Sequence, residues 1–456
     1  MQRVIRKAII CTTLSITSII AANSHTADNP SSKTYSPYAS TNHPQNVYWG
    51  DTHIHSKFSA DAYIRGNRLS LEDTFRFAQG EAVMSTTGKT IQLREPLDFV
   101  VVADHAEFLG IMNLLNENDP EFINTPLGKR WSRLKTEQGL RAVMQEFLAV
   151  TVGQLDLDYA ETTKHTAWQT ITQTVERFNQ PGVFTALQGY EWSATPDGQN
   201  LHRNIVFRDN AATVNQLIPV SALDSPNPET LWQALAHYEQ TTGGKALAIP
   251  HNGNASNGTM YTDKDFNGQA LTAAYAQTRA RWEPLMEITQ IKGDGETHPV
   301  LSPDDEFANY ETWDDSNLTR STAKEPWMLQ YEYGRSALKL GLQLDATLGK
   351  NPFKYGFIGS SDTHTGLASV QENNFTGKFS SDEPRANRAK WGIATHSPTK
   401  IKPYIAKNHT ASGYAAVWAT ANTRAAIFDA MQRKETYATT GPKMVVRFFG
   451  GWDFEQ

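Results

Sequence analysis

Short apolar runs alternate with longer helical patterns along most of this chain, and this alternation limits the folds open to it. The runs are continuous and rich in β-branched and aromatic residues, as expected for strands buried on both faces. They lie at residues 47–49, 97–102, 183–187, 204–207, 246–249, 285–288 and 355–358. Helical patterns fall between them at residues 127–148, 163–178 and 228–239. Strand–helix alternation of this kind predicts an α/β protein with a parallel sheet or barrel.

The chain has 456 residues, which suits either two or three average domains or one α/β barrel with insertions. We expect a signal peptide at residues 1–24, an N-terminal tail at 25–45 and the barrel at 46–456. Four segments are interpreted as insertions, because one is a helical block and the others are polar and loop-like: 110–180, 253–280, 296–325 and 366–410. Long excursions from a compact domain are usually functional lids or irregular loops.

The first two dozen residues have the layout of a secretory signal peptide. Arg3, Arg6 and Lys7 precede an uncharged, mostly apolar run that is short for a membrane span, and small residues follow it. We therefore expect a periplasmic or secreted bacterial protein that has no membrane attachment after cleavage; an uncleaved N-terminal anchor is the alternative. The single cysteine, Cys11, lies inside this segment. Any metal in the mature chain must then be held by His, Asp and Glu.

Charge and composition exclude some partners. The formal net charge is -6 and the pI is about 6.1, with no long run of one sign. Such a chain is not expected to bind nucleic acid. We expect its partner to be a small, anionic molecule, and no pattern in the sequence indicates an oligomeric state.

Ligand-type side chains follow the predicted strands at several separate places. The chain has 13 histidines. The residues at or near strand ends are His53, His55, Asp104, His105, Glu191, His202, His251, Asp362 and His364. In α/β barrels the carboxyl ends of the strands converge on one mouth, so residues far apart in sequence can meet there.

The spacing of these residues favours metal binding. Two histidines separated by one residue on an extended segment point to the same side, as in His53-Ile-His55, and Asp362-Thr-His364 repeats the geometry with one oxygen. Glu191 could bridge two cations. Mixed nitrogen and oxygen ligation suits zinc, manganese or iron. Each motif alone could be an ordinary turn or a buried pair, but their joint occurrence at five strand ends predicts a metal site.

Five other histidines lack this context and are interpreted as ordinary surface or loop residues: His165, His237, His298, His396 and His409. Of these, His298 is kept as an outside candidate near the site.

The order of the motifs resembles the PHP (polymerase and histidinol phosphatase) superfamily. The resemblance extends from about residue 48 to 441 and includes Gly-Asp-Thr-His53-Ile-His55, Asp61, Ala-Asp-His105, Gly-Tyr-Glu191, His202, Pro-His251 and Ser-Asp362-Thr-His364. The segment 423–441 resembles a branch of that superfamily found in exported bacterial proteins. The resemblance implies a distorted (β/α)7 TIM-like barrel with helical and loop insertions. It also implies two or three divalent transition metal ions (manganese, zinc or iron) at the mouth, and hydrolysis, usually of phosphate esters.

Carried over by position, the resemblance assigns a role to each ligand. It places one ion on His53, His55, Glu191 and Asp362, and these four are expected to act in catalysis through a metal-bound hydroxide. Glu191 would bridge to a second ion that is held also by His202 and His251. A third ion would lie on Asp61, His105 and His364, but Asp61 is not followed by the usual glycine, so the third site stays open.

The leading hypothesis is therefore an exported metal-dependent phosphoesterase. Basic residues near the motifs, Arg203, Lys292 and Arg65, are candidates for binding a substrate anion, although each could also be a solvated surface charge. No Gly-x-Ser-x-Gly elbow and no P-loop is present, which disfavours covalent acyl transfer and nucleotide-driven work. Two alternatives remain: a metal-dependent hydrolase of amides, lactones or other carbonyl substrates, and a non-catalytic barrel that binds metal or ligand.

Overall fold

The structure, a computed structural model, describes residues 43–155, 161–390, 392–394, 401, 404–405, 408–409 and 413–450. The predicted signal peptide and all but the last three residues of the predicted tail lie outside these ranges. Apart from His43, the described residues belong to one compact unit, Pro44–Gln456. Within the described residues, no helix combines the length and the apolar character that crossing a bilayer requires.

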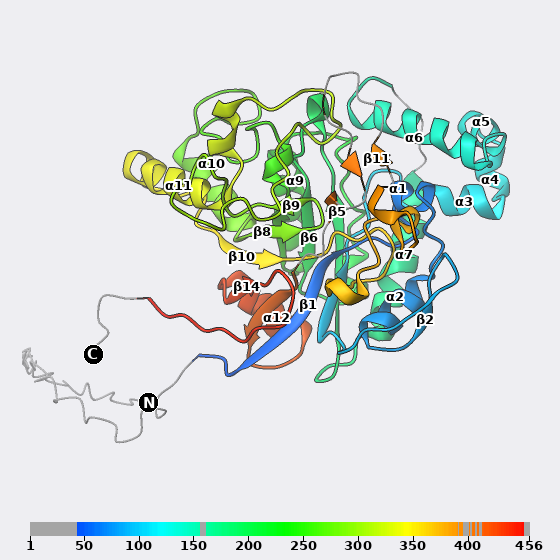
Figure 1. Cartoon of the computed structure of the whole chain (residues 1–456), viewed down its shortest axis with the longest axis horizontal. Helices are drawn as coiled ribbons and strands as arrows, with labels where there is room; N and C mark the ends of the chain where they lie inside the picture. The colour runs from blue at the N-terminus through cyan, green and yellow to red at the C-terminus, as the bar shows by residue number, and fades with distance from the viewer. Residues whose placement is uncertain are drawn as a thin grey trace, which may run out of the picture. The chain divides into compact units, whose positions relative to one another are not determined.

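A seven-stranded sheet forms the centre of this unit, in the order β14-β13-β1-β4-β5-β6-β7 (Figure 1). Its strands are β1 (Asn46–Ile54), β4 (Phe99–Val102), β5 (Thr185–Trp192), β6 (Arg203–Phe207), β7 (Ala246–Pro250), β13 (Ala415–Ala419) and β14 (Thr436–Ala438). A second sheet has the order β10-β8-β9, from β8 (Leu285–Gln290), β9 (Gly293–Asp294) and β10 (Gly356–Gly359). Two small pairs are β2 (Val83–Met84) with β3 (Thr90–Ile91), and β11 (Gly392–Ala394) with β12 (Tyr404–Ile405). All seven strands predicted from the apolar runs are confirmed.

The fold is thus mixed α/β with a curled seven-stranded sheet, which agrees only in part with the expected barrel. β1, β4 and β5 are parallel, but β6 runs antiparallel to both of its neighbours. The link from β5 to β6 is residues 193–202, shorter than the dozen or so residues that a parallel crossover needs. The hydrogen-bonded ladder is also split into two sheets. Near the ligands, an isolated parallel bridge from Ile54 to Thr363 joins the end of β1 to the segment after β10.

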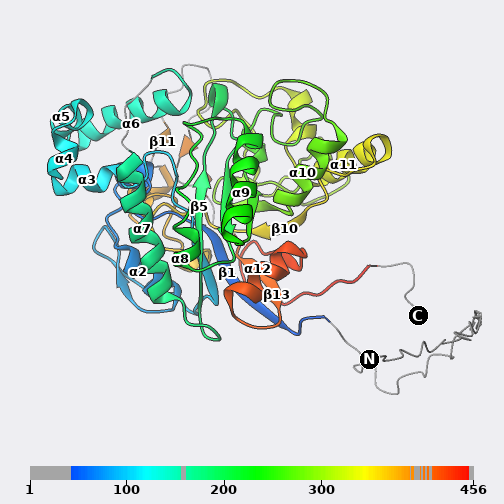
Figure 2. The same cartoon turned by 180° about the vertical axis from the view of Figure 1, so that it is seen from behind.

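Helices cover the sheet and extend from it. They are α1 (Ala60–Ile64), α2 (Leu71–Ala78), α3 (Ile111–Glu117), α4 (Pro120–Ile123), α5 (Pro126–Ser132), α6 (Glu137–Thr151), α7 (Glu161–Phe178), α8 (Ala211–Val214), α9 (Pro228–Thr242), α10 (Ala273–Trp282), α11 (Gly334–Leu348) and α12 (Arg424–Gln432). Short 3-10 turns lie at Pro196–Gly198, Gly253–Ala255, Pro326–Tyr331, Glu372–Asn374, Ser380–Asp382 and Arg388–Lys390. Seen from behind, α7 and α9 lie over the same face of the main sheet (Figure 2). They confirm the helices predicted at 163–178 and 228–239.

Both faces of the sheet are buried, which explains the continuous apolar runs. In β4, Val100 and Val102 pack into a core that also holds residues of α2, α7 and α9. The alternate residues, Phe99 and Val101, pack into a second core with residues of β8, β10 and α12. Successive side chains of a strand point to opposite faces, so an apolar residue is needed at every position.

The helical block after β4 has a small core of its own. Apolar residues of α1 and of α3–α6 pack together around Phe108, Trp131 and Val143, and α3–α6 are grouped at one side of the sheet in Figure 1. The single helix predicted at 127–148 is wrong, because the chain forms α5 and α6 with a break between them. Thr136 is extended at this break, and its side chain accepts a hydrogen bond from the Gly139 amide, which caps α6.

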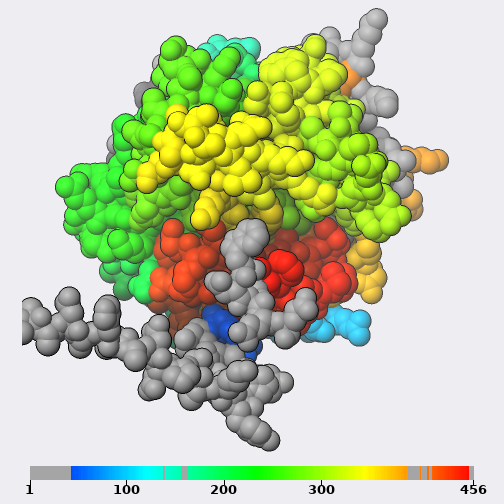
Figure 3. Space-filling view, turned by 90° about the vertical axis from the view of Figure 1, so that its left-hand side faces the viewer, coloured from blue at the N-terminus to red at the C-terminus, as the bar shows by residue number. Residues whose placement is uncertain are grey.

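The C-terminal segment of the described chain adds two strands at one edge of the main sheet. β13 pairs antiparallel with β1, and β14 pairs with β13 and lies against β10. The Thr423 side chain caps α12 between them. Figure 3 shows α11, in yellow, above the orange and red residues of this segment on one face.

Candidate metal centre

All nine predicted metal ligands meet at one end of the main sheet. His53 lies one residue before the end of β1 and His55 follows the strand, His105 follows β4, Glu191 lies near the end of β5, and His251 follows β7. The others are Asp61 on α1, His202 before β6, and Asp362 and His364 after β10. Each has at least one nitrogen or carboxylate oxygen within 3.4 Å of another member.

The reversed direction of β6 explains why His202 belongs to this group although it precedes its strand. Trp192 at the end of β5 pairs with Arg203 at the start of β6, and Arg203 pairs with Pro250 at the end of β7. The start of β6 therefore lies beside the ends of its two neighbours. Glu191, His202 and His251 come together for this reason.

Two histidines and two carboxylates of the cluster face one another at similar separations. His53 Nε2 lies 3.4 Å from both Glu191 Oε2 and Asp362 Oδ1. His55 Nε2 lies 3.2 Å and 3.3 Å from the same two oxygens. An ion about 2.1 Å from four tetrahedral ligands would separate neighbouring ligand atoms by about 3.4 Å. The four observed separations match this value.

Both imidazoles are held so that their Nε2 atoms face the carboxylates. His53 Nδ1 lies 3.1 Å from Glu287 Oε2, and His55 Nδ1 lies 2.8 Å from Ser59 Oγ. Among the described residues, both Nε2 atoms are buried and have no hydrogen-bond partner. Partners on the far ring nitrogen are the usual means by which proteins orient metal-binding histidines. The residues present therefore fit a divalent cation held by two imidazoles and two carboxylates.

The second carboxylate oxygen of Glu191 faces a different pair of imidazoles. Glu191 Oε1 lies 2.7 Å from His202 Nδ1 and 3.0 Å from His251 Nε2. These three side chains place ligand atoms close enough for a shared ion. Glu191 thus directs one oxygen to each of two groups, which is the arrangement a bridging carboxylate needs.

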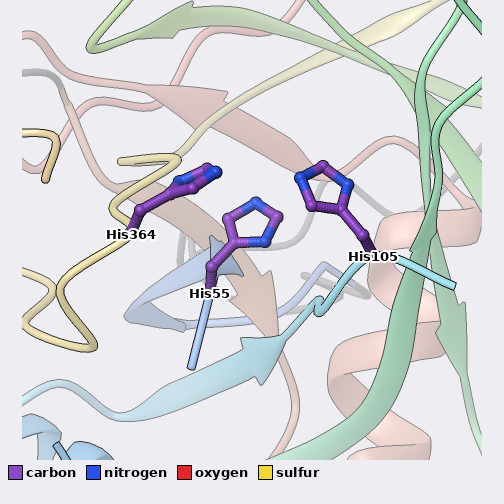
Figure 4. Close-up of side chains that lie close together, drawn as sticks. All are labelled: His55, His105 and His364. Carbon is purple, nitrogen blue, oxygen red and sulfur yellow. The ribbon is translucent and has the colours of Figure 1, made fainter. Parts of the chain in front are cut away.

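A third group lies on the α1 side of the cluster. Asp61 Oδ1 is 3.4 Å from His105 Nε2, and Asp61 Oδ2 is 2.9 Å from His364 Nε2. The rings of His55, His105 and His364 converge from three segments of the chain (Figure 4), and their nitrogens also lie within reach of one ion.

The electrostatics of the cluster favour added positive charge. Burial opposes a charged imidazole, but Asp362 and Glu287 outweigh it and raise the pKa of His53 to about 10. Burial likewise opposes the charge of Glu191, but the neighbouring His105 and His202 hold the pKa of its carboxyl well below its usual range. Buried carboxylates at this density are costly unless they are paired with cations.

Two lysines supply part of this positive charge, because both pair with Asp362. Lys292 Nζ lies 2.5 Å from Asp362 Oδ2, and Lys378 Nζ lies 2.5 Å from Asp362 Oδ1. Lys292 was predicted as an anion-binding residue, whereas Lys378 lies in the polar segment 366–410, where nothing in the local sequence separates it from a surface lysine. Burial lowers the pKa of Lys378, and Asp362 only partly offsets this, leaving it at about 8.

A cavity of about 440 Å³ opens onto the ligands. Its floor includes Asp61, His105, Glu191, His202, Asp362 and His364, and its walls come from all four segments interpreted as insertions. The wall includes Met144, Phe147, Leu148, Thr151, Trp313, Leu318, Arg320, Lys378, Phe379 and His409. Arg65 also lines the cavity, with its guanidinium carbon 4.6 Å from the centre of the Phe379 ring.

Two positions differ from expectation. Arg203 was a candidate for substrate binding, but its buried guanidinium lies 2.9 Å from Glu283 Oε1, with Trp192 beside it. Because it starts a central strand, its side chain enters the core behind the cluster. His409 was interpreted as an ordinary histidine, yet it is buried, lines the cavity and lies 3.2 Å from Asp382 Oδ2. His298, the outside candidate, pairs with Asp314 instead.

Glu287 is a further residue that sequence reasoning missed. It lies inside β8, where it is buried and accepts a hydrogen bond from Ser360 at 2.8 Å while facing His53. A charged residue inside an otherwise apolar strand, Leu-Met-Glu287-Ile, is the signal that could have found it.

Fold and site together define a mixed α/β protein with a buried histidine and carboxylate cluster suited to metal binding. Residues 42–456 match the family described as "Protein of unknown function (DUF3604)", and the chain belongs to it. Among curated proteins, none matches this chain in sequence.

One solved structure resembles the chain at low similarity. It is a two-domain protein from Bacteroides vulgatus containing a predicted PHP-like metal-dependent phosphoesterase, with 11% identity and a TM-score of 0.34. The match covers 86% of this chain and 65% of that one, so the chain spans less than two thirds of its length. Likeness at this level says nothing about the reaction.

Proposed function

We propose that the protein is an exported metal-dependent hydrolase, and that it is a phosphoesterase. The observation that carries the proposal is the arrangement of His53 and His55 around Glu191 and Asp362. Two buried imidazole nitrogens and two carboxylate oxygens lie at the separations of a tetrahedral ion site. The motif order that resembles the PHP superfamily supports the same reaction class.

The ligand set fits two or three divalent ions of manganese, zinc or iron. His53, His55, Glu191 and Asp362 would hold the first. Glu191, His202 and His251 would hold the second, and Asp61, His105 and His364 a third. Such ions, when bound, acidify water toward neutrality and offset the charge of a phosphoryl group.

The residues of the chain itself would bind and orient the substrate. Lys292, Lys378, Arg65 and Arg320 all line the cavity, and both lysines also pair with Asp362. Together these charges suit an anionic group above the cluster. The cluster beneath is almost closed to solvent, since His53 and His55 have no exposed surface and Glu191 has 1%. Burial limits the contact of bulk water with these ligands, which strengthens the electrostatic contacts among them, while the cavity leaves room for the water that hydrolysis consumes.

The concentration of cations favours a phosphate ester over a neutral carbonyl substrate. An amide or lactone needs one polarised oxygen, whereas a phosphoryl group presents several charged oxygens at once. Four cationic side chains around one cavity match the several charged oxygens of a phosphoryl group better than the one polarised oxygen of an amide or lactone. Export remains part of the proposal and rests on the N-terminal sequence pattern; fractionation of cells that express the full chain would test it.

The test of function is a substrate panel with manganese-, zinc- and iron-loaded protein. We expect turnover of phosphate esters, loss of turnover with a chelator, and loss in His53→Ala. His237→Ala, which replaces a histidine that does not line the cavity, serves as the matched control and should keep full activity. Turnover of an amide or lactone with none on any phosphomonoester or phosphodiester would contradict the phosphoesterase assignment.

A further inference from the structure

One face of α6 borders the cavity, although Phe147 and Met144 on this face also pack in the core of the helical block. Met144, Phe147, Leu148 and Thr151 all line the cavity and follow the spacing i, i+3, i+4 and i+7. Leu148 is 41% exposed, although its neighbours Val143 and Val150 are buried in the core of the helical block. The exposed leucine is therefore not needed to hold α6 in place. We call these four residues the α6 stripe.

Apolar side chains from other segments also line the cavity. Trp313 and Leu318 come from the segment 296–325, and Phe379 follows Lys378. The Phe379 ring lies 5.1 Å from the His364 ring, so it stands beside the ligands. The cavity thus has a charged floor and a wall in which separate insertions place these apolar side chains beside polar ones such as Asn317 and Thr319.

The volume exceeds what an inorganic phosphate group requires. A cavity of about 440 Å³ falls within the range of sites that enclose whole small molecules, roughly 300–1,000 Å³. With the anionic group above the cluster, the remaining space would be bordered by the α6 stripe. A polar alcohol group there would lose water without gaining hydrogen bonds from Met144, Phe147 or Leu148.

We propose that the substrate is an anionic ester whose alcohol part is a bulky apolar group, an aryl or branched alkyl group, that lies against the α6 stripe. The proposal rests on the proposed function for the position of the anionic group. It assigns a role to the helical block: α6 selects the leaving group, while the strand ends carry the reaction.

The experiment compares two ligands that share one anionic head. Phenylphosphonate and methylphosphonate are titrated into manganese-loaded full-length protein by calorimetry. Burying a phenyl ring against apolar side chains is expected to favour phenylphosphonate by about tenfold or more. Leu148→Gln and Met144→Gln should each reduce this ratio by about fivefold, because each substitution removes apolar surface from the stripe.

Leu342→Gln is the matched control. Leu342 is also an exposed leucine on a long helix, α11, and does not line the cavity. This variant should keep the wild-type ratio. Thermal unfolding of each variant checks that the substitutions leave the protein folded.

Equal affinity for the two phosphonates would overturn the inference, and so would an unchanged ratio in both stripe variants. Either result could occur while phosphate esters are still hydrolysed, which would leave the proposed function standing. Conversely, a tenfold preference that depends on Leu148, in a protein that hydrolyses no phosphate ester, would support the apolar subsite and refute the phosphoesterase assignment.

Discussion

The floor and the wall of the cavity are built in different ways. The floor consists mostly of buried side chains on or beside strands, with Asp61 of α1 added, and they are fixed by contacts with one another and by partners such as Glu287 and Ser59. The wall consists of residues from helices and loops inserted between the strands, and some of them, such as Leu148, are half exposed. A site on regular elements is held more closely than one on loops. If the protein is the proposed hydrolase, we expect the floor to determine the reaction and the wall to determine which ligand enters the cavity.

The largest effect is expected from Asp362→Asn. The substitution removes a charge that faces His53, His55 and both lysines, so turnover should fall on the order of a hundredfold to a thousandfold. Asp362 has a positive φ of 55°, which asparagine also tolerates, so the backbone should be kept. Steady-state kinetics and metal analysis measure the effect. Asp345→Asn on the exposed side of α11 is the control. Unchanged turnover in Asp362→Asn would show that Asp362 is not one of the functional residues of the floor.

Removal of metal should destabilise the whole unit. Ions that bind only the folded state stabilise it by about 4 kcal/mol at a thousandfold excess over Kd. Chelator should therefore lower the unfolding temperature, and added manganese, zinc or iron should restore it. The shift should be smaller in His53→Ala than in His237→Ala. If chelator left the unfolding temperature of metal-containing protein unchanged, the floor would be rigid without ions.

Arg203→Leu should act on stability rather than on substrate binding. The change leaves Glu283 buried with one arginine partner, Arg279, instead of two, and removal of one member of a buried ion pair costs about 3 kcal/mol. Denaturant unfolding measures the loss. A raised KM for a phosphate ester with unchanged unfolding would restore the original expectation that Arg203 contacts the substrate.

Glu287→Gln tests how far the floor extends behind the ligands. An amide cannot supply the negative charge that orients His53, and loss of such a partner typically costs about 10–100-fold in metal affinity or activity. Competition of the protein with a fluorescent metal indicator measures the affinity. Glu296→Gln, an exposed change in a pair with Arg335, should have no effect. Equal metal affinity in Glu287→Gln and the wild type would show that Glu287 does not support the site, and that the floor consists of the nine ligands alone.

The smallest effect is expected from His409→Gln, which alters the wall beside Asp382. Glutamine can still hydrogen-bond the carboxylate, so turnover should change less than tenfold and metal content should stay the same. Kinetics with two esters of different alcohol size would show whether the change depends on the substrate. A loss as large as that in Asp362→Asn would place a wall residue in the reaction and break the division between floor and wall.

The floor was largely predictable from sequence, because its ligands sit beside short strands whose apolar runs are distinct. His53-Ile-His55 and Asp362-Thr-His364 were found in this way. Glu287 and Lys378 were missed, since one lies inside a strand and the other in a polar insertion. The direction of β6 was missed as well, because apolar runs do not record whether a strand is parallel to its neighbours.

The wall could not be predicted at the level of residues. The insertions were recognised as such, but no local pattern shows which face of a helix meets a cavity made by segments more than a hundred residues away. The chain breaks between α5 and α6, and α6 starts anew at the Thr136 cap. The face of α6 that meets the cavity therefore depends on where this cap lies and not on the apolar period of the sequence. His409 illustrates the same point, because its partner Asp382 lies in another turn of the chain.

The pairing of β1 with β13 also has a consequence for biosynthesis. β1 is among the first strands made, yet its antiparallel partner at residues 415–419 is among the last. At about 5–20 residues per second, the ribosome needs roughly 20–70 s to reach β13 after β1. During that interval one edge of β1 has no partner strand. His53 and His55 have been made, whereas Asp362 is added only late in the interval. The ligand cluster is therefore complete only after Asp362 and His364 have been made, late in the synthesis of the chain.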